Sequence, residues 1–371
     1  MLLGVLLSSR FNAIKQYDVE KLTDETNTVI KCIVWDLDNT LWDGIISEND
    51  HLIPNKKAIE AIKHLDGYGI LHSISSKNNH EDAMAKIESM GLKDYFLFPQ
   101  IGWQNKSESI RTIKEKLNIG FDAIAFIDDQ PFERNEVNFV HPEVKCYDVD
   151  IIERIKSEDI FRPRFVTDES SMRRAMYLSD QVRAKQEETA VSNTAFLSTL
   201  EMKLKIQPAT LMDLARVEEL TIRTNQLNAT GYTYSYDELV SLLESPDYQI
   251  YVAEFEDKYG TYGKIGIVML QLKDNEWIIK LLLVSCRVMS RGVGGIILNT
   301  IINYSQQMGK TLFAEFMPTD RNRIMFISYK LSGFENHKTL KEEGGLLLKY
   351  IPQSQDAKPE GSFIKIDFIQ N

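Results

Sequence analysis

Short apolar runs alternate with amphipathic stretches of helical period between residues 30 and 150. This alternation is typical of a parallel sheet whose strands are connected by helices. It predicts strands at residues 31–35, 69–75, 95–99, 123–127 and 144–147. It predicts helices between them at residues 55–65, 80–90 and 106–117. We therefore expect an α/β domain with a doubly wound parallel sheet over residues 30–160.

The second half of the chain has a different pattern. Residues 161–200 contain Pro163 and a polar, helix-prone stretch rich in Arg and Gln, which indicates a helical linker. Beyond it, apolar strands and amphipathic helices predict an α+β domain over residues 201–371. The predicted strands are 203–207, 249–255, 264–272, 276–284 and 312–316, and the predicted helices are 211–223, 294–307 and 321–331. Residues 1–29 form an extension whose MLLGVLL start we interpret as a packed or frayed end rather than a secretion signal.

Composition narrows the class of protein. A length of 371 residues fits about two domains. The 43 Lys and Arg against 54 Asp and Glu give a net charge of −11, which disfavours a nucleic-acid partner. No apolar run reaches membrane length, so we expect no membrane partner. Three cysteines are too few for a disulfide framework, and we expect a cytoplasmic protein.

Acidic residues stand where two of the predicted strands end. Asp36 and Asp38 follow the first strand, and Asp128 and Asp129 follow the fourth. Functional sites of α/β sheets form at this carboxyl edge. Two carboxylates so close repel each other, so a cation or a phosphoryl group would stabilise them. The alternative for each is a loop carboxylate that caps a helix or faces solvent.

Further polar residues fall at the same edge: Ser75 and Ser76 end the second strand, and Lys106 opens a helix. This ordered set resembles the haloacid dehalogenase superfamily, with its Asp-x-Asp-x-Thr loop, Ser or Thr, Lys and late acidic pair. The resemblance covers residues 30–150 and implies a Rossmann-like sheet. The spacing from Asp36 to Ser75 leaves no room for a cap domain, so the site would be open.

The resemblance also implies roles for these residues. Asp36 would be the nucleophile on phosphorus, and Asp38 would protonate the leaving oxygen and then deprotonate water. Thr40, Ser75, Ser76 and Lys106 would contact the phosphoryl oxygens. Mg²⁺ would be held by Asp36, Asp38 through its carbonyl, Asp128 and Asp129.

The second half contains a cysteine at the end of a predicted strand. Cys286 follows a predicted strand in LLLVSCRVMSRGVGG, just before a glycine-rich turn that opens a helix. Arg287 next to it would favour the thiolate. No histidine lies near it in sequence, and a purely structural thiol is the alternative. Cys32 and Cys146 fall within apolar strands and are interpreted as small buried hydrophobes.

The turn after Cys286 resembles the coenzyme A-binding turn of the GNAT acyltransferase fold. Arg291 and Gly294 match that turn, whereas Ile296 stands where Gly or Ala is usual. The departure disfavours free coenzyme A, although a tethered pantetheine arm would still fit the groove. The resemblance implies a GNAT-like α+β fold for the second half.

Taken together, the two halves resemble the FkbH-type glyceryl transferase/phosphatases of polyketide and related biosynthesis. The stretches that carry this match are WDLDNTLWDG, SISSKNN, FIDDQPFERNEV, TIRTNQLNAT and LLVSCRVMSRGVGG. Asp43 is a departure, since glycine is common there. The family implies that a glyceryl unit passes from 1,3-bisphosphoglycerate to Cys286 and then to the phosphopantetheine arm of an acyl carrier protein. Asp36 would remove the remaining 3-phosphate.

Other residues acquire candidate binding roles from this resemblance. Asn225 and Gln226 would hydrogen-bond substrate or pantetheine, or simply cap a helix, and Arg287 and Arg291 would contact phosphate. A basic group in the linker would dock the acidic carrier, unless it is only a charged helix surface: Arg162, Arg164, Arg173, Arg174 and Arg183.

Two other functions stay open on sequence alone. The chain is a Mg²⁺-dependent phosphatase whose second domain only binds a partner or acyl-CoA, or it is an acetyltransferase-like or scaffold protein with a silent phosphatase half.

Overall fold

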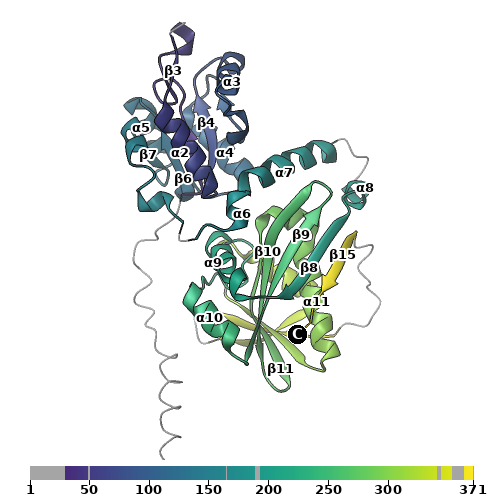
Figure 1. Ribbon diagram of the computed structural model, residues 1–371. Coiled ribbons are helices and arrows are strands. Elements are labelled where there is room, and N and C mark those ends of the chain that lie inside the picture. Colours follow the sequence, from purple (N-terminus) through teal and green to yellow (C-terminus); the bar gives the residue numbers. More distant parts are fainter. Residues whose placement is uncertain are drawn as a thin grey trace, which may run out of the picture.

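The computed structural model describes residues 30–48, 51–163, 165–188, 193–340, 344–352 and 363–370. The expected N-terminal extension and Arg164 lie outside these residues. The described chain forms one large sheet in each half, with a long helix between them, and a small two-stranded sheet in the first half (Figure 1). No described helix is long and apolar enough to cross a membrane.

The first half contains a five-stranded parallel sheet with the order β5-β4-β1-β6-β7. Its strands are β1 (Cys32–Trp35), β4 (Leu71–Ser76), β5 (Gln100–Ile101), β6 (Ile124–Ile127) and β7 (Lys145–Tyr147). Its helices are α2 (Lys56–Gly67), α3 (His80–Ser89), α4 (Lys106–Leu117) and α5 (Pro131–Val140).

Alternate residues of β1 pack on opposite faces of this sheet. Ile33 and Trp35 join a core that includes buried residues of α2 and α3. Cys32 and Val34 join a second core with buried residues of α4 and α5. Helices therefore cover both faces, and the predicted doubly wound α/β fold class is confirmed.

One predicted strand is wrong. Residues 95–99 do not form a strand, because η4 (Lys93–Tyr95) leads into a turn and Phe98 has a left-handed φ of 51°. The edge strand is β5 instead. Between β1 and α2, the chain forms only a hairpin of β2 (Trp42–Asp43) and β3 (Ile53–Pro54) with η3 (Ile46–Glu48). The described residues of this connection thus contain no cap domain.

The second half contains an eight-stranded mixed sheet with the order β13-β14-β12-β11-β10-β9-β8-β15. Its strands are β8 (Met202–Pro208), β9 (Tyr248–Asp257), β10 (Gly260–Leu272), β11 (Glu276–Val284), β12 (Thr311–Phe316), β13 (Phe334–Thr339), β14 (Leu346–Tyr350) and β15 (Ile364–Phe368). Its helices are η8 (Leu211–Asp213), α9 (Leu214–Arg223), α10 (Tyr236–Glu244), η9 (Cys286–Arg291), α11 (Val293–Gln307) and α12 (Arg323–Leu331).

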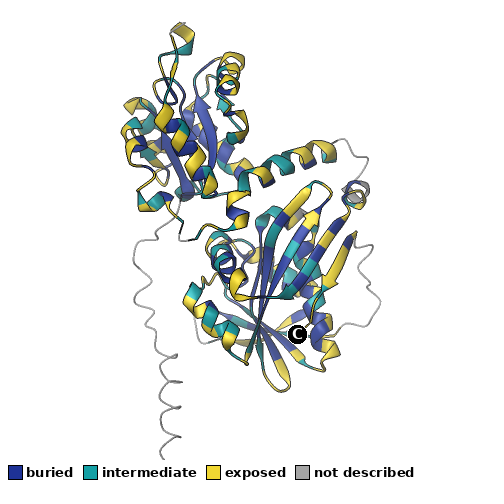
Figure 2. Ribbon diagram, viewed as in Figure 1, coloured by how far each residue is buried: buried dark blue, intermediate teal, exposed yellow. Residues whose placement is uncertain are grey.

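Both faces of the mixed sheet are covered by helices. One core includes buried residues of α9 and α10, and the other includes buried residues of α11 and α12. The middle strands are largely buried in Figure 2. The α+β class predicted for the second half is confirmed, although α10 and β13–β15 were not among the predicted elements.

A charged helical segment joins the halves: α6 (Asp168–Ser171), α7 (Arg173–Glu188) and α8 (Asn193–Ser198). Arg174 Nε donates to Asp66 Oδ1 at 2.9 Å in the first half, and Arg183 Nε donates to Asp257 Oδ2 at 2.8 Å in the second. Arg183 is only 1% exposed. Arg174 and Arg183 are engaged in these contacts. They therefore do not form the expected basic docking surface for a carrier protein.

Three short 3₁₀ helices complete the first half: η5 (Phe121–Ala123), η6 (Val149–Glu153) and η7 (Asp159–Phe161).

Candidate active sites

A buried ion cluster occupies the carboxyl edge of the parallel sheet. Asp36 follows β1, Asp128 follows β6, and Lys106 is the first residue of α4. Lys106 Nζ lies 2.5 Å from Asp36 Oδ1 and 2.7 Å from Asp128 Oδ2. The three side chains are at most 9% exposed. One cation is therefore shared by two carboxylates that are nearly shielded from water.

The pKa values of this cluster follow from burial and charge. Burial raises the pKa of Asp36 to about 7, Lys106 opposes this shift, and Asp128 adds to it. Burial also disfavours the charged form of Lys106, but the two carboxylates outweigh it and leave the pKa of Lys106 raised. Lys106 is thus held as a cation between the two aspartates.

Asp38 is held at the same edge by three donors. Trp42 Nε1 donates to Asp38 Oδ1 at 2.9 Å, and the amide of Ile46 approaches the same oxygen at 3.3 Å. Asn78 Nδ2 donates to Asp38 Oδ2 at 3.0 Å and also lies 3.1 Å from Ser76 Oγ. Neither Trp42 nor Asn78 was singled out from the sequence as a site residue, although both stand in the WDLDNTLWDG and SISSKNN stretches.

The hydroxyls at this edge differ in their surroundings. Ser76 joins the Asp38 network through Asn78. The hydroxyl oxygens of Ser75 and Thr40 are buried and have no hydrogen-bond partner among the described residues. A buried polar atom without a partner is costly, and a bound phosphoryl group would remove that cost.

Three carboxylates of the cluster suit a divalent cation. One oxygen each of Asp36, Asp128 and Asp129 lies within 4.8 Å of the other two. Carboxylate oxygens are the ligands that Mg²⁺ prefers. The Asp38 side chain is not in this group, because its oxygens accept hydrogen bonds from Trp42, Ile46 and Asn78. The residues present therefore fit the predicted metal site.

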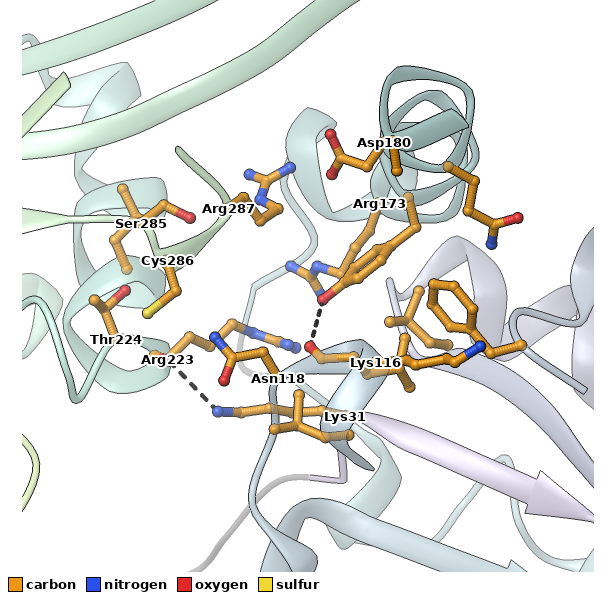
Figure 3. Close-up of a pocket in the computed structure, with 18 of the residues that line it drawn as sticks. Lys31, Lys116, Asn118, Arg173, Asp180, Arg223, Thr224, Ser285, Cys286 and Arg287 are labelled. Carbon is orange, nitrogen blue, oxygen red and sulfur yellow. Dashed lines mark hydrogen bonds between the residues drawn. The ribbon is translucent and has the colours of Figure 1, made fainter. Parts of the chain in front are cut away.

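A second candidate site lies between the two halves, around Cys286. A pocket of about 450 Å³ is lined by residues of the first half, of α7 and of the second half. Cys286 and Lys31 project toward the pocket from the two halves (Figure 3). Lys31 Nζ donates to the carbonyl oxygen of Arg223 at 3.5 Å.

The surroundings of Cys286 differ in part from the prediction. Its Sγ lies 3.9 Å from Gln226 Oε1, whereas Asn225 is exposed and is not among the pocket residues. Burial raises the pKa of the Cys286 thiol, and Lys31 acts in the opposite direction. No histidine is found among the described residues that line the pocket.

The two predicted arginines of this region both line the pocket but have structural contacts. Arg287 Nη2 donates to the Tyr262 carbonyl oxygen at 3.1 Å, and its Nη1 contacts the sulfur of Met176. The expectation that Arg287 activates the thiol is therefore not supported by its contacts. Arg291 lies 3.5 Å from Glu187 and stacks on the Phe196 ring.

The acidic site and the Cys286 pocket lie at opposite edges of the parallel sheet. Lys31 precedes β1 and Asp36 follows it, so they stand about 16 Å apart at about 3.3 Å per strand residue. In the same way, α4 begins at Lys106 in the acidic site and ends at Leu117 in the pocket. A small molecule bound at Cys286 does not reach Asp36 in this arrangement.

Comparison with known proteins gives partial likenesses only. No family model and no curated protein matches the chain. The N-terminal part of a Bacteroides fragilis protein, containing a phosphatase domain complexed with Mg, is 32% identical over 36% of this chain, with a TM-score of 0.34. This chain covers 41% of that structure's length.

Two acetyltransferase structures match with lower identity. The ribosomal-protein-S18-alanine N-acetyltransferase of Escherichia coli is 13% identical, covering 42% of this chain and 99% of its own, with a TM-score of 0.31. The PaiA N-acetyltransferase of Thermoplasma acidophilum, in complex with coenzyme A, is 15% identical, covering 40% and 98%, with a TM-score of 0.33. With TM-scores below 0.5, these likenesses decide neither family nor function.

Proposed function

We propose that the chain is a Mg²⁺-dependent phosphomonoester hydrolase with Asp36 as its nucleophile. The observation that carries this proposal is the buried cluster in which Lys106 joins Asp36 and Asp128 at the carboxyl edge of the sheet. An anionic nucleophile attacks an anionic phosphoryl group only when positive charge lies between them. Lys106 supplies one such charge.

The residues of the site divide the reaction between them. An Asp36 oxygen forms a bond to phosphorus while the bond to the leaving oxygen breaks, and Asp38 gives that oxygen its proton. Asp38 then takes a proton from water, whose oxygen attacks phosphorus. The bond between phosphorus and the Asp36 oxygen breaks, which restores the Asp36 carboxylate and releases inorganic phosphate. The donors on Asp38 from Trp42 and Asn78 hold it in place for both transfers.

Asp36, Asp128, Asp129 and the Asp38 carbonyl would hold Mg²⁺, which when bound adds positive charge beside the phosphoryl oxygens. Ser75 and Thr40 offer their buried hydroxyls to those oxygens. Ser76 has a supporting role, because its hydroxyl helps to hold Asn78.

The test is phosphate release from a phosphomonoester by the purified chain. We expect Asp36→Asn to lower turnover at least about 10³-fold, since it removes the nucleophile. Asp43→Asn, which changes an exposed carboxylate in the neighbouring strand β2, is the matched control and should retain activity. EDTA should abolish release, and Mg²⁺ should restore it. Full activity of Asp36→Asn would rule out the proposal.

The resemblance to FkbH-type enzymes extends this proposal to the Cys286 site. There the thiolate attacks the acyl carbon of 1,3-bisphosphoglycerate and expels phosphate, which leaves a thioester. A carrier protein's pantetheine thiol then takes the acyl group. Because the two sites lie at opposite edges of the sheet, the acyl unit has to travel on that arm to Asp36, which then removes the 3-phosphate.

Intact-mass spectrometry after addition of 1,3-bisphosphoglycerate tests this extension. In the absence of a carrier protein we expect a phosphoglyceryl adduct on both the wild-type chain and Asp36→Asn, and none on Cys286→Ala. An adduct that survives Cys286→Ala eliminates the thioester.

The separation of the two sites also favours a second candidate function. In it, the first half acts as a phosphatase by itself and the second half only recognises a partner. In that case Cys286→Ala would leave turnover of the phosphatase substrate unchanged.

A further inference from the structure

The pocket beside Cys286 carries a large excess of positive charge. Among the described residues that line it, seven are basic and two, Asp180 and Glu187, are acidic. Figure 3 shows Lys31, Lys116, Arg173, Arg223 and Arg287 around the same space, arriving from both halves and from α7. Such an excess is unusual in a partly enclosed space, since like charges repel there more strongly than in water.

The nearby acids do not balance this charge. Glu219 lies behind the pocket and is shared by three arginines: its oxygens lie 2.7 Å from Arg216 Nη1 and 3.1 Å from Arg223 Nε, and one also contacts Arg173. A single carboxylate thus serves three guanidinium groups. Within this group of described residues, one negative charge therefore faces three positive charges.

Arg291 is a further unsatisfied group of this pocket. Its side chain is 8% exposed, and its Nη1 is buried without a hydrogen-bond partner among the described residues. The carboxylate of Glu187 lies 3.5 Å from this nitrogen, which makes an ion pair but is too long for a strong hydrogen bond. A buried guanidinium N–H without an acceptor is costly, so an acceptor from a ligand would stabilise it.

The pKa values agree with missing negative charge. Burial and the nearby Arg223 lower the pKa of Lys31 to about 8. Burial and Arg173 lower the pKa of Arg223 to about 9, and burial and Arg216 lower that of Arg287 to about 10. An anion in the pocket would oppose these shifts.

We infer that this interdomain pocket binds a small phosphorylated ligand next to Cys286, with Lys31 and Arg223 as its main phosphate-binding residues. A phosphate dianion offers the acceptors and the charge that these groups lack. The volume of about 450 Å³ is within the range of small-molecule sites. Because Lys31 belongs to the first half and Cys286 to the second, the site requires both halves.

The inference rests on the proposed thioester chemistry only for the identity of the ligand, which would then be the phosphorylated acyl donor. It places a phosphate-binding site at the edge of the sheet opposite to Asp36. The phosphate held here is therefore not the one presented to Asp36 at the same moment.

Alkylation of Cys286 by iodoacetamide, followed by peptide mass spectrometry, reads this pocket directly. The full chain is kept in EDTA, so that the acidic site is inactive, and 3-phosphoglycerate is the probe. We expect saturable protection of Cys286, and none from glycerate or from sodium chloride at the same ionic strength. Absence of protection at millimolar 3-phosphoglycerate would overturn the inference.

Substitutions of Lys31 and Arg223 test whether the protection comes from binding in this pocket. Lys31→Gln and Arg223→Gln should each raise the concentration for half protection by about tenfold, as expected for one lost charged hydrogen bond. Lys31→Arg keeps the charge and should keep most of the protection. Lys57→Gln, which removes an exposed lysine paired with Glu153, is the matched control. Equal protection in Lys31→Gln and Arg223→Gln would refute the assignment.

A third probe separates the two sources of phosphate. Protection by 4′-phosphopantetheine without protection by 3-phosphoglycerate would show that the pocket receives the carrier's arm and would overturn the small-ligand inference. The outcome is independent of the phosphatase proposal, because phosphate release from Asp36 is not measured. A chain that is inactive as a phosphatase and protected by 3-phosphoglycerate would refute only the proposed function.

Discussion

Replacing Lys106 with methionine is the most direct perturbation of the acidic site. Methionine has a similar length but no charge, so the change leaves Asp36 and Asp128 buried without their shared cation. Removing one partner of a buried ion pair typically costs about 3–5 kcal/mol. We expect Lys106→Met to lower the free energy of unfolding of the first half by that amount near pH 8, in EDTA.

The cost should depend on pH. Burial raises the pKa of Asp36 to about 7 even though Lys106 opposes the shift, so loss of Lys106 should raise this pKa further. A carboxyl group with a raised pKa in the folded protein destabilises it when ionised, and the penalty disappears as pH falls and the group is protonated. Over this range the penalty in the free energy of unfolding changes by about 1.4 kcal/mol per pH unit. The deficit of Lys106→Met should therefore be smaller at pH 5.5 than at pH 8.

Urea unfolding at the two pH values measures this difference. Tryptophan fluorescence reports mainly the first half, because Trp35, Trp42 and Trp103 lie there and only Trp277 lies in the second. Lys57→Met is the control, since this exposed ion pair should contribute less than about 1 kcal/mol. The reasoning fails if Lys106→Met costs less than about 1 kcal/mol at pH 8, or costs the same at both pH values.

Three further predictions concern other buried polar groups. Burial lowers the pKa of His72 to about 3, so the unfolded state takes up a proton that the folded state excludes. Below about pH 6.5 the free energy of unfolding should therefore fall by up to about 1.4 kcal/mol per pH unit. A His72→Gln variant that shows the same acid dependence in urea titrations would contradict this. Arg183→Met strands the buried Asp257 and should cost about 3–5 kcal/mol by thermal or urea unfolding, and a loss under about 1 kcal/mol would be inconsistent with the buried pair. Asn78→Ala removes a donor to Asp38 and should lower kcat about tenfold with little change in KM; unchanged kcat would exclude the positioning role.

The sequence was most informative where chemistry and secondary structure are local. Asp36 directly follows a fully apolar strand, and parallel strands bring their carboxyl ends to one edge, so its proximity to Lys106 and Asp128 could be anticipated. The prediction for residues 95–99 went wrong because the apolar run Tyr-Phe-Leu-Phe also suits a buried turn. Its left-handed Phe98 leaves no trace in the hydrophobic pattern.

Contacts between the halves could not be anticipated. Lys31 meets residues around Cys286 only because the linker sets the orientation of the two sheets, and no periodicity encodes that orientation. The neighbouring position of Arg287 suggested that it would act on the thiol. Its side chain instead reaches Tyr262 and Met176, because a 3₁₀ turn sends successive side chains in different directions.

The helix α7 has a consequence for how the linker tolerates change. One end of it is fixed by Arg174 on Asp66, and Arg183 is fixed nine positions later on Asp257. Inserting a single residue between them would turn the later part by about 100° and shift it by about 1.5 Å. An insertion or deletion between the two anchors would therefore put Arg174 and Arg183 out of phase with their partners and disrupt the pocket that is lined by both halves.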